Sequence, residues 1–182
     1  GEDDATKKLV LQNERVRAVA NYYPGGASVA EHEHTAPRAV VVIEGGTLEV
    51  HASDDGINAT SGTSTTTDVG GVVEADDGAM VTITGGEVLI NSEGDGIDSN
   101  GSALVTGGTT TVFGAATDRE GALDTNGSLV VTGGTVLAVG MAGMAVAPDE
   151  SSAQGWLSAA LDQAYGAGVS VQVLDTSGTV VA

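Results

Sequence analysis

Short stretches in the middle of the chain alternate between apolar and polar residues, and each of them follows a pair of glycines. Every second side chain of a β-strand faces the same side, so this alternation predicts strands that bury one face. β-branched residues are frequent in these stretches, as in TVLAV at residues 135–139. The glycine pairs begin at Gly45, Gly85, Gly107 and Gly133. We therefore expect a series of short strands, each entered through a glycine turn.

The spacing of the glycine pairs predicts an internal repeat. The last three pairs begin 22 and 26 residues apart, and the first pair precedes the second by 40 residues. A period in the twenties is typical of solenoids, in which each turn of the chain stacks on the previous one. Leucine-rich repeats need leucine and asparagine at fixed offsets that are missing here, and helical repeats are longer. Short β-branched strands instead predict an all-β parallel β-helix, in which equivalent residues stack about 4.8 Å apart.

The repeat covers only the middle of the chain, which predicts three regions. Residues 46–150 form the laps, a lap being one turn of the solenoid, whereas residues 1–45 do not repeat. Residues 60–78 are rich in Thr, Ser and Gly, and we expect one irregular lap with a protruding loop there. A solenoid end exposes apolar edges and unpaired backbone groups. We therefore expect residues 151–182 to form a β cap with Trp156 in its core.

Charge narrows the range of partners. The chain has 25 acidic and 6 basic residues, a formal net charge of −19. Nucleic acids and anionic membrane surfaces are bound through Lys and Arg, so we expect neither as a partner. No apolar run approaches the ~18 residues of a membrane-spanning helix, so no insertion into a membrane is expected. The acidic excess leaves two interpretations open, which are solubility and carboxylates that hold cations.

Other features of the composition remove further classes of site. The chain contains no cysteine, which excludes disulfides, thiolate metal sites and cysteine nucleophiles. It has 28 glycines and only 3 prolines, which favours many tight turns. Its first residues, GEDDATKK, show no signal peptide.

Aspartates gather in three glycine-containing stretches, which are SDDGINA at residues 53–59, GDGIDSNG at residues 94–101 and EGALDTNG at residues 120–127. In stacked laps, the second and third stretches would place Asp98 beside Asp124 and Asn100 beside Asn126. Stacked carboxylates repel unless a cation or hydrogen bonds separate them. Solvated turn residues are the alternative, since Asp, Asn and Gly favour turns. The 12-residue pattern of an EF-hand is absent, so the ligands of a cation would come from neighbouring laps.

With these motifs in view, the region from about Gly45 to the C-terminus resembles a bacterial family of extracellular carbohydrate-binding proteins. The motifs that carry the resemblance are SDDGINA, GGEVLINSEGDGIDSNGS, GALDTNGSLVVTGGTVLAVG and GMAVAP. The family consists of calcium-containing, right-handed parallel β-helices that are related in architecture to polysaccharide lyases. The resemblance implies that fold, Ca²⁺ as cofactor, a cellulose-like or pectin-like polysaccharide as partner, and an extracellular or cell-surface location. It also implies calcium ligands among Asp54, Asp55, Asp95, Asp98, Asn100 and Asp124.

Residues 1–45 resemble the first half of a cupin domain. The metal motif of cupins, G-x5-H-x-H-x3-E-x6-G, is matched by Gly26, His32, His34 and Gly45. Arg38 stands in place of the glutamate ligand, and the second cupin motif is absent. Two histidines at i and i+2 lie on one face of a strand, so His32 and His34 form a second, weaker metal candidate. The alternative is a solvated pair on a strand that caps the solenoid.

Three functions remain open at this point. The leading hypothesis is a calcium-stabilised β-helix that binds polysaccharide on a flat strand face, without catalysis. A structural or adhesive solenoid with no sugar specificity is the second. A polysaccharide lyase, the third, would need a basic residue to remove a proton next to a uronate. After Arg38 only Arg119 and the weakly basic His51 are available, and arginine is a poor base, so we do not expect an enzyme.

Overall fold

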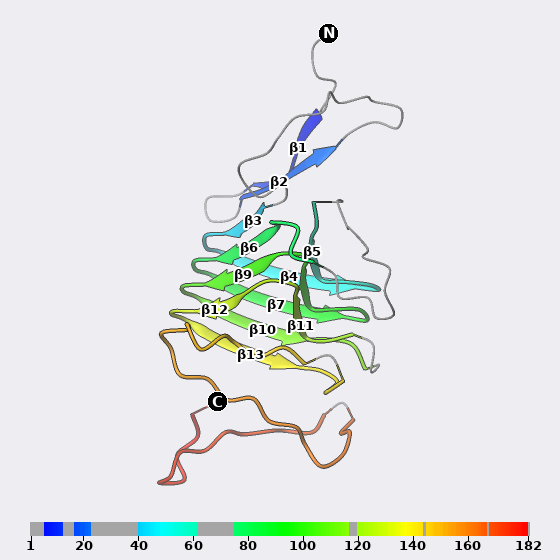
Figure 1. Ribbon diagram of the computed structural model, residues 1–182. Helices are drawn as coiled ribbons and strands as arrows, with labels where there is room; N and C mark the ends of the chain where they lie inside the picture. Colours follow the sequence, from blue (N-terminus) through cyan, green and yellow to red (C-terminus); the bar gives the residue numbers. More distant parts are fainter. Residues whose placement is uncertain are drawn as a thin grey trace.

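The computed structural model describes residues 6–12, 17–22, 40–61, 75–116, 120–143, 145–166 and 168–181. The regular secondary structure of these residues consists of β-strands alone, with no helix, which confirms the all-β prediction. The first two strands, β1 (Thr6–Gln12) and β2 (Arg17–Tyr22), pair antiparallel. The strands from β3 to β13 form three parallel sheets that lie one beside another along the molecule (Figure 1).

Each sheet contains strands that are far apart in the sequence. The first sheet consists of β3 (Val40–Ile43), β6 (Met80–Ile83), β9 (Ser102–Val105) and β12 (Leu129–Val131). The second sheet consists of β4 (Thr47–Ala52), β7 (Glu87–Ser92), β10 (Thr109–Phe113) and β13 (Thr135–Val139). The third sheet consists of β5 (Ile57–Ala59), β8 (Ile97–Ser99) and β11 (Leu123–Thr125).

The chain visits the three sheets in the same order in every lap. Strands β3-β4-β5 are followed by β6-β7-β8, then by β9-β10-β11, and finally by β12-β13. Each strand pairs in parallel with its counterpart in the next lap, as the repeat predicts. Because β4 pairs directly with β7, the 40-residue spacing between the first two glycine pairs is a single lap with an insertion. The right-handed winding stays a prediction.

The glycine pairs form the turns between the first and second sheets. The second glycine of each pair has a positive φ, which is 85° at Gly46, 92° at Gly86, 82° at Gly108 and 84° at Gly134. A positive φ is unfavourable for residues that have a Cβ, whereas glycine adopts it readily. The turns are also closely stacked, since a Cβ on Gly86 would lie 2.7 Å from the carbonyl oxygen of Gly46. Both constraints explain why the pair recurs in every lap.

The inward-facing residues of the three sheets form one aliphatic core. Ile83, Ile90, Val81 and Val112 are among its largest fully buried side chains. In β7 the buried residues alternate with exposed ones, as expected for a strand with one face in the core. Burying an Ile or Val side chain contributes roughly 1.5–3 kcal/mol, so rows of such residues stabilise the stacked laps.

The described residues that follow the last lap do not form the strands of the expected β cap. Residues 145–166 and 168–181 contain no strand, only an isolated antiparallel bridge between Leu174 and Val180. They run beyond β13, in orange to red in Figure 1. Trp156 is 48% exposed, so the expectation that it lies in the core of a β cap is wrong. An apolar sequence alone does not bury a segment that has few packing partners.

Most of the cupin-like segment lies outside the described residues. In the part that is described, the pairing of β1 with β2 is irregular between Leu9 and Leu11, and β2 contacts β3. His32 and His34 are not among the described residues. The cupin-like interpretation and the histidine metal site therefore stay predictions.

Candidate functional site

Acidic turns stack on one another where each lap passes from the second sheet into the third. Residues 53–56 connect β4 to β5, and residues 93–96 connect β7 to β8. Backbone hydrogen bonds join these two turns. The Gly56 N–H donates to the Asp95 carbonyl at 2.8 Å, and the Gly94 N–H donates to the Asp54 carbonyl at 3.2 Å. The acidic side chains of successive turns are thereby held close together.

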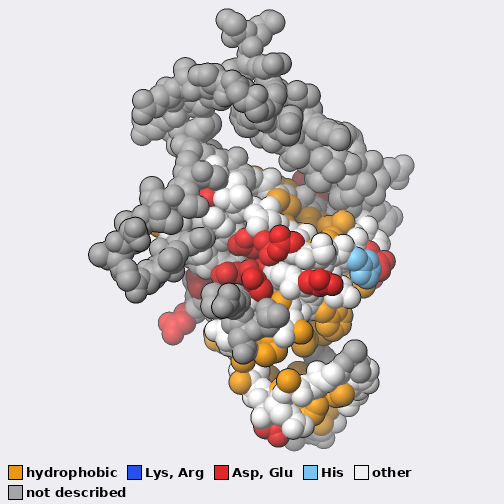
Figure 2. Space-filling view, turned by 90° about the vertical axis from the view of Figure 1, so that its right-hand side faces the viewer, with side chains coloured by type: hydrophobic (Ala, Val, Ile, Leu, Met, Phe, Trp, Pro, Cys, Tyr) orange, Lys and Arg blue, Asp and Glu red, His pale blue; other side chains and the backbone are white. Residues whose placement is uncertain are grey.

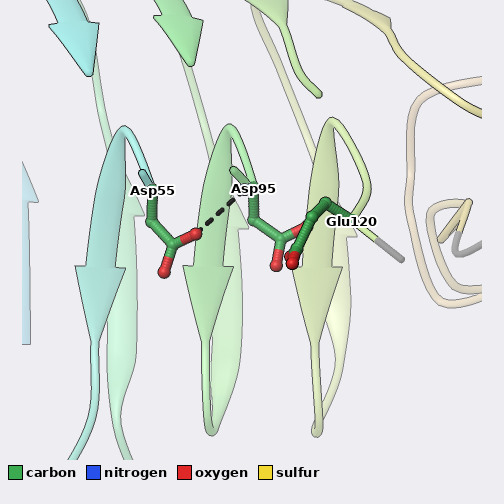
Figure 3. A group of neighbouring side chains, drawn as sticks. All are labelled: Asp55, Asp95 and Glu120. Atoms are coloured by element: carbon green, nitrogen blue, oxygen red, sulfur yellow. Dashed lines mark hydrogen bonds between the residues drawn. The ribbon is translucent and has the colours of Figure 1, made fainter. Parts of the chain in front are cut away.

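Asp55, Asp95 and Glu120 converge in these turns, one from each of three laps (Figure 3). We call these three residues the carboxylate cluster. One carboxylate oxygen of each residue lies within 4.8 Å of those of the other two. Asp95 is only 7% exposed, and Asp55 and Glu120 are half-buried. Among the residues that the structure describes, no other three His, Cys, Asp or Glu side chains meet in this way.

Hydrogen bonds fix the orientation of the two aspartates. Oδ1 of Asp55 accepts a hydrogen bond from the Asp95 N–H at 2.9 Å, which Figure 3 marks as a dashed line. Its Oδ2 accepts a hydrogen bond from Asn58 Nδ2 at 2.7 Å. Oδ1 of Asp95 accepts a hydrogen bond from the Gly121 N–H in the next lap. The carboxylates are therefore anchored to the backbone of neighbouring laps rather than extended into solvent.

The cluster is electrostatically unfavourable for three ionised carboxylates. Burial, together with the carboxyl groups of Glu120 and Asp55, raises the pKa of Asp95 to about 6, although the Gly121 N–H opposes this shift. Like charges at this separation disfavour ionisation unless something positive compensates. At neutral pH, a positive charge beside the cluster would therefore stabilise its three ionised carboxylates.

Within the described laps, no Lys or Arg side chain provides this positive charge. Residues 40–61, 75–116 and 120–143 contain neither Lys nor Arg. Figure 2 shows Asp and Glu side chains gathered over the middle of one side of the laps, with no Lys or Arg among them. Arg119 precedes Glu120 in the sequence but lies outside the described residues.

A second polar row runs along the third sheet, beside the cluster. Asn58, Asp98 and Asp124 occupy equivalent positions of β5, β8 and β11, which confirms the prediction that Asp98 lies beside Asp124. Asn58 Nδ2 also donates to Asp98 Oδ2 at 2.7 Å, and so it links this row to Asp55. The Asn58 side chain thus bonds to the carboxylates of both Asp55 and Asp98.

The remaining predicted ligands lie apart from the carboxylate cluster. Asp54 is exposed in the first turn, next to Asp55. Asn100 follows the far end of β8, where its N–H donates to the Ala59 carbonyl at 3.0 Å. Asn126 follows β11 in the next lap, and its buried Nδ2 has no hydrogen-bond partner within the described part of the chain. The structure thus groups only Asp55 and Asp95 of the six predicted ligands in the cluster.

Glu120 belongs to the cluster although the sequence prediction left it out. The pairing of Leu123 with Ile97 places Gly121, not Glu120, opposite Asp95. An acidic residue that lies one position earlier was not recognised as equivalent, yet it reaches the same place with its longer side chain. The signal was present in EGALDTNG, which begins with this residue.

Asp77 contrasts with Asp95, because several hydrogen bonds satisfy its carboxylate. It accepts hydrogen bonds from the Ser61 N–H at 2.6 Å, the Ser61 hydroxyl at 2.7 Å and the Ala79 N–H at 2.9 Å. Burial alone would raise its pKa, but the hydrogen bonds from Ser61, Ala79 and Thr60 outweigh burial and lower it. Asp95 differs, because its pKa is raised.

Comparison with known proteins gives one match. A family model described as "Carbohydrate-binding domain-containing protein" matches residues 30–175, which include the carboxylate cluster and all three parallel sheets. The chain belongs to this carbohydrate-binding family. Searches of curated proteins and of solved structures gave no match. No helix in the described part of the chain is long and apolar enough to cross a membrane.

Proposed function

We propose that this protein binds polysaccharide in a calcium-dependent manner, outside the cell or at its surface, and without catalysis. Membership of a carbohydrate-binding family is the observation that carries the binding function. The carboxylate cluster supports the part that concerns calcium. In this proposal, the stacked laps form a right-handed parallel β-helix, the ion joins neighbouring laps, and the laps present the polysaccharide-binding surface.

The geometry of the cluster fits one calcium ion. Calcium takes six to eight oxygen ligands at about 2.3–2.6 Å, so two oxygens on the same ion lie up to about 5 Å apart. The three carboxylate oxygens lie within 4.8 Å of one another, which satisfies this limit. Burial is the main cause of the raised pKa of Asp95, and a calcium ion would offset the further contribution from the Glu120 and Asp55 carboxyl groups. Asp54, Asp98, Asn100 and Asp124 remain candidates for further ligands.

The described laps favour binding over a lyase reaction. A lyase of this architecture would need a basic residue, and residues 40–61, 75–116 and 120–143 contain no Lys or Arg. The described laps contain one histidine, His51. It is exposed, and its Nε2 lies 2.9 Å from Glu49 Oε1. An adhesive solenoid without sugar specificity remains the competing proposal, and the experiment below separates the two.

The test is co-sedimentation with insoluble polysaccharides, in calcium and in EGTA. We expect the wild type to be retained on at least one polysaccharide in calcium and released in EGTA. Asp95→Asn/Glu120→Gln should behave in calcium as the wild type does in EGTA, because it removes two cluster carboxylates. Glu150→Gln changes an exposed acidic residue that follows β13, the last strand, and as the control it should bind as the wild type does. No retention on any polysaccharide would favour the adhesive solenoid, and equal retention in EGTA would exclude the role of calcium.

A further inference from the structure

We infer that a neutral polysaccharide chain binds on the outward face of the second sheet. This inference rests on the proposed function and identifies the surface and the class of polymer. Within the described laps, most of the exposed large apolar side chains lie on the second sheet. Leu89, Phe113, Leu137 and Val139 are 37%, 44%, 41% and 45% exposed.

The register of the strands arranges these side chains in rows across the sheet. Leu89, Thr111 and Leu137 are in register from β7 through β10 to β13. Asn91, Phe113 and Val139 are in register in the next row. Residues between these rows, such as Ile90 and Val112, point into the core and are fully buried. The outward face is therefore supported from beneath by the core, and it carries both apolar and hydrogen-bonding side chains.

The other two sheets offer less suitable surfaces. The outward row of the third sheet, Asn58, Asp98 and Asp124, is polar and acidic. In the first sheet, the chain that follows the last lap bonds to the free edge of β12, where the Asp149 N–H donates to the Leu129 carbonyl at 2.8 Å. Val40, at 47% exposed, is the large apolar residue that stands out on that sheet.

Charge selects a neutral polymer over an acidic one. The face carries Glu49 and Glu87 on the β4 and β7 side, and the described laps contain no Lys or Arg to neutralise a uronate. A polyuronate would be repelled by these two glutamates and also by the protein as a whole, whose formal net charge is −19. A neutral sugar ring meets no such repulsion. Its C–H face can pack on Phe113 and the leucines, and its hydroxyl groups can bond to threonine and asparagine.

The test compares a surface variant with a matched control on two polymers. Leu89→Thr/Phe113→Thr/Leu137→Thr changes only outward positions and keeps residues that favour strands. We expect it to lower the affinity for insoluble cellulose by at least about tenfold, with the circular dichroism spectrum and the calcium-induced rise in melting temperature unchanged. Phe113→Thr alone should give part of this loss. Val40→Thr, the same kind of change on the first sheet, should bind as the wild type does. Wild-type binding to polygalacturonate should be weaker than to cellulose.

Each contrary outcome has a distinct meaning. If the wild type binds cellulose and the triple variant binds it equally well, the inference is wrong while the proposed function stands. Stronger binding to polygalacturonate, unchanged in the triple variant, would place the polymer at the acidic turns and also overturn it. If sedimentation velocity shows a wild-type dimer that the triple variant dissociates, with cellulose binding unaffected, the face is an interface between copies. If the wild type binds no polysaccharide, the proposed function itself fails.

Discussion

Asp95 is buried, yet its carboxyl group lies within 4.8 Å of two other carboxylates. Its raised pKa means that the folded protein binds a proton there more tightly than the unfolded chain does. Without a cation, stability should therefore be greater when Asp95 is protonated and should fall as the proton is lost. We therefore expect the same residue to make stability depend both on pH and on calcium.

The first prediction is a pH dependence that disappears in one variant. In calcium-free buffer, the melting temperature should fall as pH rises from about 4 to about 6, between the ordinary pKa of 3.8 and the raised value of Asp95. The fall should be smaller in Asp95→Asn, because its amide does not titrate. Thermal melts across this range measure the difference, and Glu150→Gln should follow the wild type. An identical slope in wild type and Asp95→Asn would contradict the raised pKa.

The second prediction separates the carboxylate cluster from the neighbouring row. Asp98→Asn/Asp124→Asn removes as many charges as Asp95→Asn/Glu120→Gln does. It should nevertheless keep most of the calcium-induced rise in melting temperature, because Asn58 already bonds to Asp98 and the row lies outside the cluster. Calorimetric melts in calcium and in EGTA make the comparison. An equal loss in both double variants would extend the site to the third sheet.

At this scale, the sequence led to part of the cluster. Asp55 and Asp95 are two of the six calcium ligands that the family resemblance implies, and both lie in DG motifs. Glu120 was not predicted because the turn between β10 and β11 is longer than the turn between β7 and β8. Its acidic residue therefore lies one position before the residue that aligns with Asp95. Asp54 was included because sequence spacing does not show which of two adjacent aspartates faces the next lap.

At the scale of the elements, the glycine pairs and the strands that follow them decide the stacking of the laps. The strands of the second sheet were predictable, since alternation over five or six residues identifies a strand. The strands of the third sheet have three residues each, which is too short for a period to appear. Trp156 was misplaced because burial depends on tertiary partners, which its own neighbours in sequence do not reveal.

The third prediction tests the turns themselves. Gly86→Ala should destabilise the fold by about 1–2 kcal/mol or more, because φ is 92° there and the added Cβ would lie 2.7 Å from the Gly46 carbonyl oxygen. Gly155→Ala is the matched control, since nothing lies within 4 Å of its added Cβ. Urea denaturation followed by circular dichroism measures both. Equal stability of the two variants would mean that the turns do not hold the laps in register.

At the scale of the whole molecule, a net charge of −19 opposes a compact fold. The aliphatic core stabilises each lap, whereas the carboxylates stacked between laps repel one another. A cation shared by the three turns would reduce the repulsion and join the laps that form the second sheet. Calcium binding, stability and the polysaccharide-binding surface would then depend on one another.

The most direct test of this account is the melting temperature of the wild type in calcium and in EGTA. A ligand of the native state stabilises it by RT ln(1 + [L]/Kd), about 2.7 kcal/mol at a hundredfold excess over Kd. We predict that the melting temperature rises with calcium concentration in the wild type and in Glu150→Gln, and that Asp95→Asn/Glu120→Gln loses most of the rise. Identical melting of the wild type in calcium and in EGTA would contradict the account, and the aspartates would then be turn residues only.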